Sequence, residues 1–164
     1  MNKAIFIDID GVLNCSSTPN PRHFPYVADP ALLRRFHALV DRTSAFIVLA
    51  STWRYDPVGQ LAAQHYGIHF NDVLPDLPGR PRRDEILSWL ATHPHIDRYA
   101  VIDDDDDELD QLPLFQPSSK TGLTETIAAG VERYLKGETD AVMRASRITR
   151  LWERLEAALR GHRG

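Results

Sequence analysis

The chain has 164 residues, of which 43% are hydrophobic and 26% charged, and its formal net charge is −4. This length suits one domain with its own core, and the acidic balance excludes a generally basic nucleic-acid coat while allowing a local basic patch. The single cysteine, Cys15, excludes a disulfide framework and a cysteine-based zinc site. The longest apolar run, residues 45–50, is too short to span a membrane, and the first residues do not resemble a signal peptide. We therefore expect a cytoplasmic protein without a membrane segment.

Apolar runs and amphipathic segments alternate along the chain. In chain order, the pattern predicts a strand over 4–9, a loop over 14–29, a helix that begins after Asp29, a strand over 45–50, a short helix over 58–66, a loop over 75–81, a helix over 84–92, strands over 99–102 and 114–115, and a helix over 124–135. This alternation is typical of an α/β fold, a three-layer Rossmann-like parallel sheet with helices on both faces. Ligands of such sheets bind at the carboxyl ends of the strands.

The end of the chain differs in character from the rest. We divide the sequence into a domain of residues 1–137 and a segment of residues 138–164. That segment has apolar residues at helical spacing and six arginines from Arg144 to Arg163. It predicts a basic amphipathic helix packed on the same domain.

Polar side chains follow the first predicted strand. Asp8 and Asp10 lie two residues apart, on one face of the strand, and Gly11 then lets a ligand approach the backbone. Two neighbouring carboxylates repel each other unless a divalent cation neutralises them or one of them holds a proton. Alone, this pattern fits an acidic strand end with a glycine turn equally well.

The next two strand ends favour a functional interpretation. Ser51 and Thr52 follow the second strand, where hydroxyl and amide groups either bind phosphate oxygens or cap a helix. Asp103 and Asp104 begin an acidic run, residues 103–108, directly after the third strand. Because these strand ends share one edge of the sheet, together they predict a site for a hard cation such as Mg²⁺.

The same residues resemble the motifs of the haloacid dehalogenase (HAD) superfamily of phosphohydrolases. Residues 5–13 (IFIDIDGVL) match its first motif, residues 47–51 (IVLAS) its second and residues 100–104 (AVIDD) its fourth, within a likeness that covers about residues 3 to 136. The stretches DGVLN, STWR, DEILSWL and TGLT further resemble the domain named for Swiss Army Knife RNA repair proteins. The narrower likeness implies a role in nucleic-acid repair.

The resemblance implies an Mg²⁺-dependent phosphomonoester hydrolase that works through an aspartyl-phosphate. It implies Asp8 as the nucleophile, and Asp10 as the acid that protonates the leaving oxygen and then as the base that activates water. It further implies that Asp8, the Asp10 backbone carbonyl and Asp103 hold the metal, with Asp104 as another ligand or a support. Residues expected to contact the phosphoryl oxygens are Ser51, Thr52 and Gly11.

One motif departs from the superfamily pattern. Its third motif is usually a lysine ahead of the acidic strand, but no lysine lies between Ser51 and Asp103. Arg82, just before a predicted helix, is our first choice for this phosphate-binding role, ahead of Arg83 and Arg80. A guanidinium keeps the positive charge but presents it as a planar fork of donors.

The segments where caps insert in this superfamily are short. Residues 14–28 and 55–81 hold a loop, a short helix and a strand-like piece, so we expect a minimal, capless HAD fold with an open site. An open site leaves room for the terminal phosphate of a polynucleotide, which Arg22, His23 and Phe24 would contact with the arginines of the last segment. The alternatives are a small-metabolite phosphatase, a phosphotransferase with an alcohol acceptor, and a non-catalytic Mg²⁺-dependent binding module of the same fold.

Overall fold

The computed structural model describes residues 1–138, in which five strands form a single parallel sheet. The strand order is β3-β2-β1-β4-β5, with β1 at the centre and every neighbouring pair parallel. The strands are β1 (Lys3–Ile7), β2 (Phe46–Leu49), β3 (Asp72–Val73), β4 (Arg98–Ile102) and β5 (Leu114–Phe115). The α/β prediction is confirmed, and β3 pairs with the outer edge of β2.

Four α-helices and two short 3-10 helices connect the strands. They are α1 (Pro30–Thr43), η1 (Thr52–Tyr55), α2 (Pro57–His65), α3 (Arg82–Thr92), η2 (Leu109–Gln111) and α4 (Glu125–Leu135). Within residues 1–138, the segment between β1 and α1 carries no helix or strand, and the segment between β2 and α3 holds only η1, α2 and β3. The site at the carboxyl ends of the strands therefore has no separate cap among these elements.

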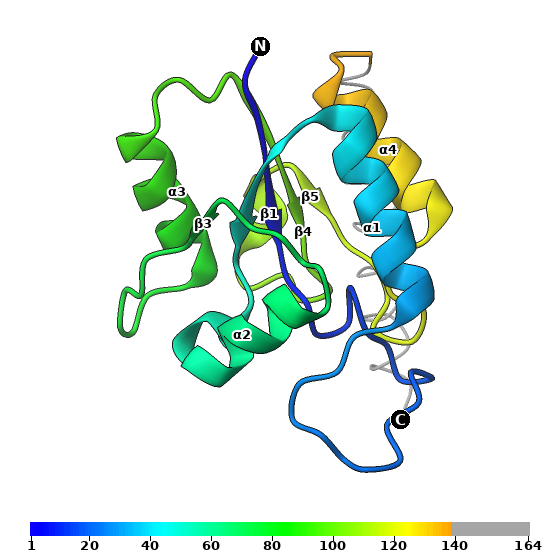
Figure 1. The fold of residues 1–164 in the computed structure, drawn as a ribbon. Helices are drawn as coiled ribbons and strands as arrows, with labels where there is room; N and C mark the ends of the chain where they lie inside the picture. The colour runs from blue at the N-terminus through cyan, green and yellow to red at the C-terminus, as the bar shows by residue number, and fades with distance from the viewer. Residues whose placement is uncertain (139–164) are drawn as a thin grey trace, which may run out of the picture.

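Two hydrophobic cores lie on opposite faces of the sheet, because alternate residues of β1 point to opposite sides. Ile5 and Ile7 pack in the core that α1 and α4 cover and that Ala63 of α2 joins. Phe6 packs in the other core, against Trp89 of α3. Figure 1 shows α1 and α4 side by side across the sheet from α3. The predicted three layers are confirmed.

Capping interactions fix where the helices begin. Asp29 accepts hydrogen bonds from the first backbone amides of α1, and Thr124 caps α4, so both helices begin as the sequence predicts. Helix α3 begins at Arg82, two residues before its predicted start. Pro81 supplies no side-chain cap there, and the Arg82 amide instead donates to the Asp107 carboxylate at 3.0 Å. The cap comes from the acidic run after β4, which local sequence patterns do not reveal.

The first strand ends earlier than the expected Ile9. After Ile7 the chain turns tightly, and the Ile9 carbonyl accepts hydrogen bonds from the amides of Val12, Leu13 and Asn14 at 2.7–3.2 Å. Asp8 therefore lies just beyond the last residue of β1, at the carboxyl ends of the strands. The helix predicted over residues 138–164 falls almost entirely outside the described residues. No helix within residues 1–138 is both long and apolar enough to cross a membrane.

Candidate active site

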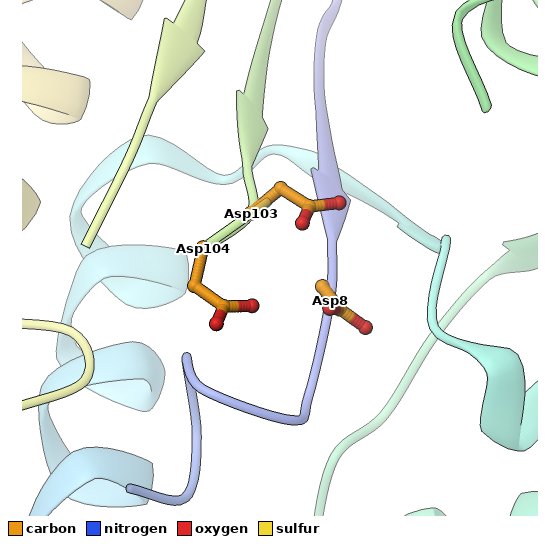
Figure 2. Close-up of side chains that lie close together, drawn as sticks. All are labelled: Asp8, Asp103 and Asp104. Atoms are coloured by element: carbon orange, nitrogen blue, oxygen red, sulfur yellow. The ribbon is translucent and has the colours of Figure 1, made fainter. Parts of the chain in front are cut away.

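Three carboxylates meet where β1 and β4 end. Asp8 follows β1 and Asp103 and Asp104 follow β4, and the two strands are hydrogen-bonded neighbours. Each side chain offers one carboxylate oxygen, and these oxygens lie within 4.8 Å of one another. Figure 2 shows Asp103 and Asp104 on the β4 side of the group and Asp8 on the β1 side. Parallel pairing thus brings together residues that are 95 positions apart in the sequence.

Within residues 1–138, the cluster carries more negative charge than the side chains around it neutralise. Asp103 is completely buried and Asp8 is 7% exposed. Burial raises the pKa of Asp8, although the Arg82 guanidinium and a hydrogen bond with Ser51 oppose it. Burial and the Asp8 charge raise the pKa of Asp103 to about 7. A divalent cation bound between these oxygens would relieve that repulsion.

Gly11 makes room for one of the three carboxylates. Its φ of +74° is in the left-handed region, and a Cβ placed on it would lie 2.2 Å from the Asp104 carboxyl group. Asp104 therefore approaches the turn after β1 only because position 11 has no side chain. An oxygen-only donor set with this space for close approach fits Mg²⁺, which prefers carboxylate and water ligands.

Of the three candidate arginines, Arg82 reaches the cluster. Its guanidinium Nη1 donates a hydrogen bond to Asp103 and lies 3.6 Å from Oδ2 of Asp8, with 13% of the side chain exposed. Its place at the first turn of α3 directs it toward the ends of β1 and β4. Arg80 and Arg83 instead pair with carboxylates outside the cluster.

The two hydroxyl residues after β2 lie at different depths. Ser51 is completely buried, caps η1 by accepting from the Trp53 amide at 3.4 Å, and hydrogen-bonds with Asp8. Thr52 is exposed at the start of η1. Ser51 therefore lies beside Asp8, whereas the Thr52 side chain is exposed to solvent.

The Asp10 carboxylate is not part of the cluster and is held by two hydrogen-bond donors. Its Oδ1 accepts from Nδ2 of Asn14 at 2.8 Å, and its Oδ2 accepts from the indole Nε1 of Trp53 at 2.9 Å. Of the predicted acidic residues, only Asp10 has its carboxylate outside the cluster. Asn14 and Trp53 are site residues that the sequence does not single out, although Asn14 lies in the DGVLN stretch and Trp53 in the STWR stretch.

A second buried ion pair lies at the end of β2. The Arg54 guanidinium pairs with Glu85 of α3 and donates to the backbone carbonyls of Ala50 and Ser51. Both side chains of the pair are less than 5% exposed. The pair ties the end of β2 to the helix that carries Arg82. Arg54 lies in the STWR stretch and Glu85 in the DEILSWL stretch, but nothing in the sequence indicates that the two side chains pair.

Comparison with known proteins agrees with this arrangement. Residues 4–128 match a family model described as the HAD domain in Swiss Army Knife RNA repair proteins. That range spans β1 to the first turn of α4 and includes every residue of the site described above. No curated protein matches the chain.

Proposed function

The chain belongs to the family of HAD domains in Swiss Army Knife RNA repair proteins, and we propose that it is an Mg²⁺-dependent phosphomonoester hydrolase. Membership of this family implies phosphohydrolase-type chemistry. The observation that carries the proposal is the meeting of Asp8, Asp103 and Asp104 at one sheet edge, with Arg82 beside them. This edge offers a carboxylate nucleophile, oxygen ligands for a cation and a fixed positive charge for a phosphoryl group.

Asp8, Asp103 and Asp104 would hold the metal with their side chains, together with the backbone carbonyl of Asp10. When bound, Mg²⁺ supplies positive charge that neutralises the phosphoryl oxygens during transfer. Arg82 stays close enough to Asp8 to contact the same phosphoryl oxygens, and Ser51 lies on the β2 side of Asp8. Thr52 and the backbone at Gly11 complete the proposed phosphate contacts.

The proposed reaction has two halves. In the first, an Asp8 oxygen forms a bond to phosphorus while the ester P–O bond breaks, and Asp10 gives its proton to the leaving oxygen. In the second, Asp10 takes a proton from water, whose oxygen attacks phosphorus as the bond to Asp8 breaks. Inorganic phosphate leaves, and both aspartates return to their starting forms.

We propose that the substrate is a terminal phosphate on a polynucleotide. Within residues 1–138 no separate cap lies over the site, so a bulky molecule can present a phosphate to it. The side chains of Arg22, His23 and Phe24 are exposed in the loop before α1. This loop packs beside η1, because the rings of Tyr26 and Trp53 meet edge-on with their centroids 5.0 Å apart. This loop combines positive charge with an aromatic ring, as single-stranded nucleic-acid sites do.

The opposite rim of the site repels a polyanion. The exposed acids that follow Asp104 lie against the start of α3, where Asp107 caps Arg82 and Glu108 pairs with Arg83 at 3.5 Å. A polynucleotide bound by its end would therefore leave the site across the loop of residues 14–29. Because the chain is acidic overall, with a net charge of −4, we expect its contact with nucleic acid to be limited to this loop.

The test compares kcat/KM for an end-phosphorylated oligonucleotide with that for the matching mononucleotide, at low and high salt. We expect the oligonucleotide to react better and to lose its advantage as salt rises, because phosphate contacts release counterions. The double change Arg22→Ala and Phe24→Ala should lower the oligonucleotide value about 10-fold and leave the mononucleotide value unchanged.

The matched control for the loop variant is Arg133→Ala. Arg133 is exposed on α4. The carbonyl of its neighbour Tyr134 accepts a hydrogen bond from Arg98, the first residue of β4. Arg133 therefore lies near the amino end of β4, whereas the site lies at the carboxyl ends of the strands. This change should affect neither substrate. A mononucleotide that reacts better, with the same salt response as the oligonucleotide, would contradict the polynucleotide proposal and favour a small-metabolite phosphatase.

A further inference from the structure

Asp10 is held by two hydrogen-bond donors from different parts of the chain. Asn14 Nδ2 reaches Oδ1 at 2.8 Å and Trp53 Nε1 reaches Oδ2 at 2.9 Å, so each carboxylate oxygen has its own donor. Asn14 follows β1 in the sequence, whereas Trp53 lies in η1 after β2. An otherwise exposed aspartate is thereby fixed in one orientation beside the acidic cluster.

Asn14 is itself fully engaged. The second hydrogen of its Nδ2 goes to the Val27 carbonyl at 2.9 Å, and its Oδ1 accepts from the Gly11 amide at 2.9 Å. The side-chain amide therefore links the turn after β1 to the loop before α1. Both Nδ2 hydrogens of Asn14 are therefore donated, one to Asp10 and one to Val27.

Trp53 is equally constrained. The side chain is 2% exposed, and its ring packs against Tyr26, whose hydroxyl donates to Asp56 at the start of α2. At Gly59 of α2, an added Cβ would lie 2.5 Å from the Trp53 carbonyl, so the helix packs directly on η1. The indole ring has one N–H donor, and this packing fixes the ring so that the N–H points to the Asp10 carboxylate.

We infer that Trp53 and Asn14 are positioning residues that set the orientation of the Asp10 carboxylate for proton transfer. The inference rests on the proposed function, in which Asp10 gives a proton to the leaving oxygen and later takes one from water. Trp53 acts through Asp10 and does not contact the phosphoryl group. Its loss therefore matters most where the leaving group needs a proton.

The first test uses Trp53→Phe, which removes the indole N–H and keeps an aromatic ring. For an alkyl phosphate, whose leaving oxygen needs protonation, kcat should fall about 10-fold, a part of the usual contribution of acid–base catalysis. For an aryl phosphate with a good leaving group, kcat should change much less. KM should stay the same for both substrates.

Trp89→Phe is the matched control. Trp89 is also buried, and its Nε1 donates to a carboxylate, that of Asp72, at 2.7 Å on the α3 side of the sheet. This variant loses the same kind of hydrogen bond but should keep the wild-type ratio of alkyl to aryl turnover. A purely structural effect of Trp53→Phe would lower both rates together, and that result would overturn the positioning role.

A second measurement needs no turnover. Trp53→Phe and Trp89→Phe assign the indole N–H signals in a ¹H–¹⁵N spectrum. Asp10→Ala should then shift the Trp53 indole signal and speed its hydrogen exchange, while the Trp89 signal stays in place. An unmoved Trp53 signal would show that the hydrogen bond does not exist in solution and would overturn the inference.

The two proposals fail in different ways. A wild-type protein that hydrolyses neither ester in the presence of Mg²⁺ overturns the proposed function, and the positioning role with it. An active enzyme with equal losses on both esters, or with no shift of the Trp53 signal, overturns the positioning role alone.

Discussion

Arg54 and Arg82 both pair with buried carboxylates near the strand ends, but the charge around them differs. Arg54 faces one acid, Glu85, and its two terminal nitrogens, Nη1 and Nη2, also donate to the Ala50 and Ser51 carbonyls and the Tyr55 hydroxyl. Among the described residues, Nε of Arg54 is the one buried side-chain nitrogen or oxygen without a partner. The Arg54 region is balanced, one charge against one.

Arg82 stands beside a surplus of negative charge. One guanidinium faces both Asp8 and Asp103, and Asp104 lies next to them. The pKa of each of these three carboxyls is raised, first by burial. Arg54 and Glu85 thus form a pair of equal and opposite charges, whereas the carboxylates around Arg82 outnumber it. A balanced ion pair should show its effect in stability, and an unbalanced one in binding and turnover.

The largest effect on stability is expected at Arg54. Arg54→Ala leaves the Glu85 carboxylate buried and unpaired, which costs about 3–5 kcal/mol of unfolding free energy. Urea unfolding monitored by circular dichroism measures the loss. The double change Arg54→Met with Glu85→Leu should recover much of it, because both charges are then absent. A loss below about 1 kcal/mol in Arg54→Ala, the range of an exposed pair, would contradict the assigned structural role.

Arg82 should show the opposite profile. Arg82→Ala is expected to lower kcat/KM about 10²- to 10³-fold, the usual effect of removing one donor to a transferring group. Its unfolding free energy should change less than that of Arg54→Ala. Arg82→Lys should retain much of the activity because it keeps the charge.

Arg80→Ala and Arg83→Ala are the controls, since neither side chain reaches the cluster. Steady-state kinetics on the four variants compare the positions directly. A silent Arg82→Ala beside an impaired Arg80→Ala or Arg83→Ala would show that the phosphate-binding arginine is misplaced by a few residues.

A smaller effect is expected in how the stability of the protein depends on pH, and it tests the surplus of negative charge around Asp103. The pKa of Asp103 is about 7 in the folded chain, above its ordinary value of 3.8, so the native state binds more protons than the unfolded state between these values. The Asp103 contribution to stability is therefore full below about pH 4 and is lost as the pH rises through 7.

Asp103→Asn removes that loss and keeps an oxygen that can accept from the Asp105 amide, which lies 3.0 Å from Oδ1 in the wild type. Without Mg²⁺ at pH 8, the variant should melt above the wild type, and each kcal/mol gained corresponds to about 2–4 °C. Mg²⁺ should raise the melting temperature of the wild type more than that of the variant. A variant that melts below the wild type at pH 8 would contradict the surplus of negative charge.

Local patterns were sufficient to predict most of the fold. Strands β1, β2 and β4 are short apolar runs, and α1 and α4 begin at caps that lie next to them in the sequence. The start of α3 was missed because its cap, Asp107, lies 25 residues away. The two-residue β3 has too short a pattern to identify, beyond a strand-like piece in residues 55–81.

The site, like the fold, has features that local sequence patterns predict and others that they do not. Asp8, Asp103 and Asp104 could be placed together because parallel strands end at a common edge. The orientation of Asp10 could not be predicted, since it depends on a hydrogen bond to Trp53, 43 residues away. Arg54 and Glu85 lie in stretches that carry the family resemblance, but their pairing could not be predicted because they are 31 residues apart. Local spacing predicts which element carries a side chain, and packing decides where it points.

The central claim is that Asp8 attacks phosphorus, and trapping its phosphorylated form tests this most directly. The protein is mixed with Mg²⁺ and an aryl phosphate, quenched in acid within one turnover, digested and analysed by mass spectrometry. We predict one added phosphoryl group on the peptide that contains Asp8, and neither this adduct nor turnover in Asp8→Asn. Full turnover by Asp8→Asn, or a phosphoryl group on another residue, would contradict the account.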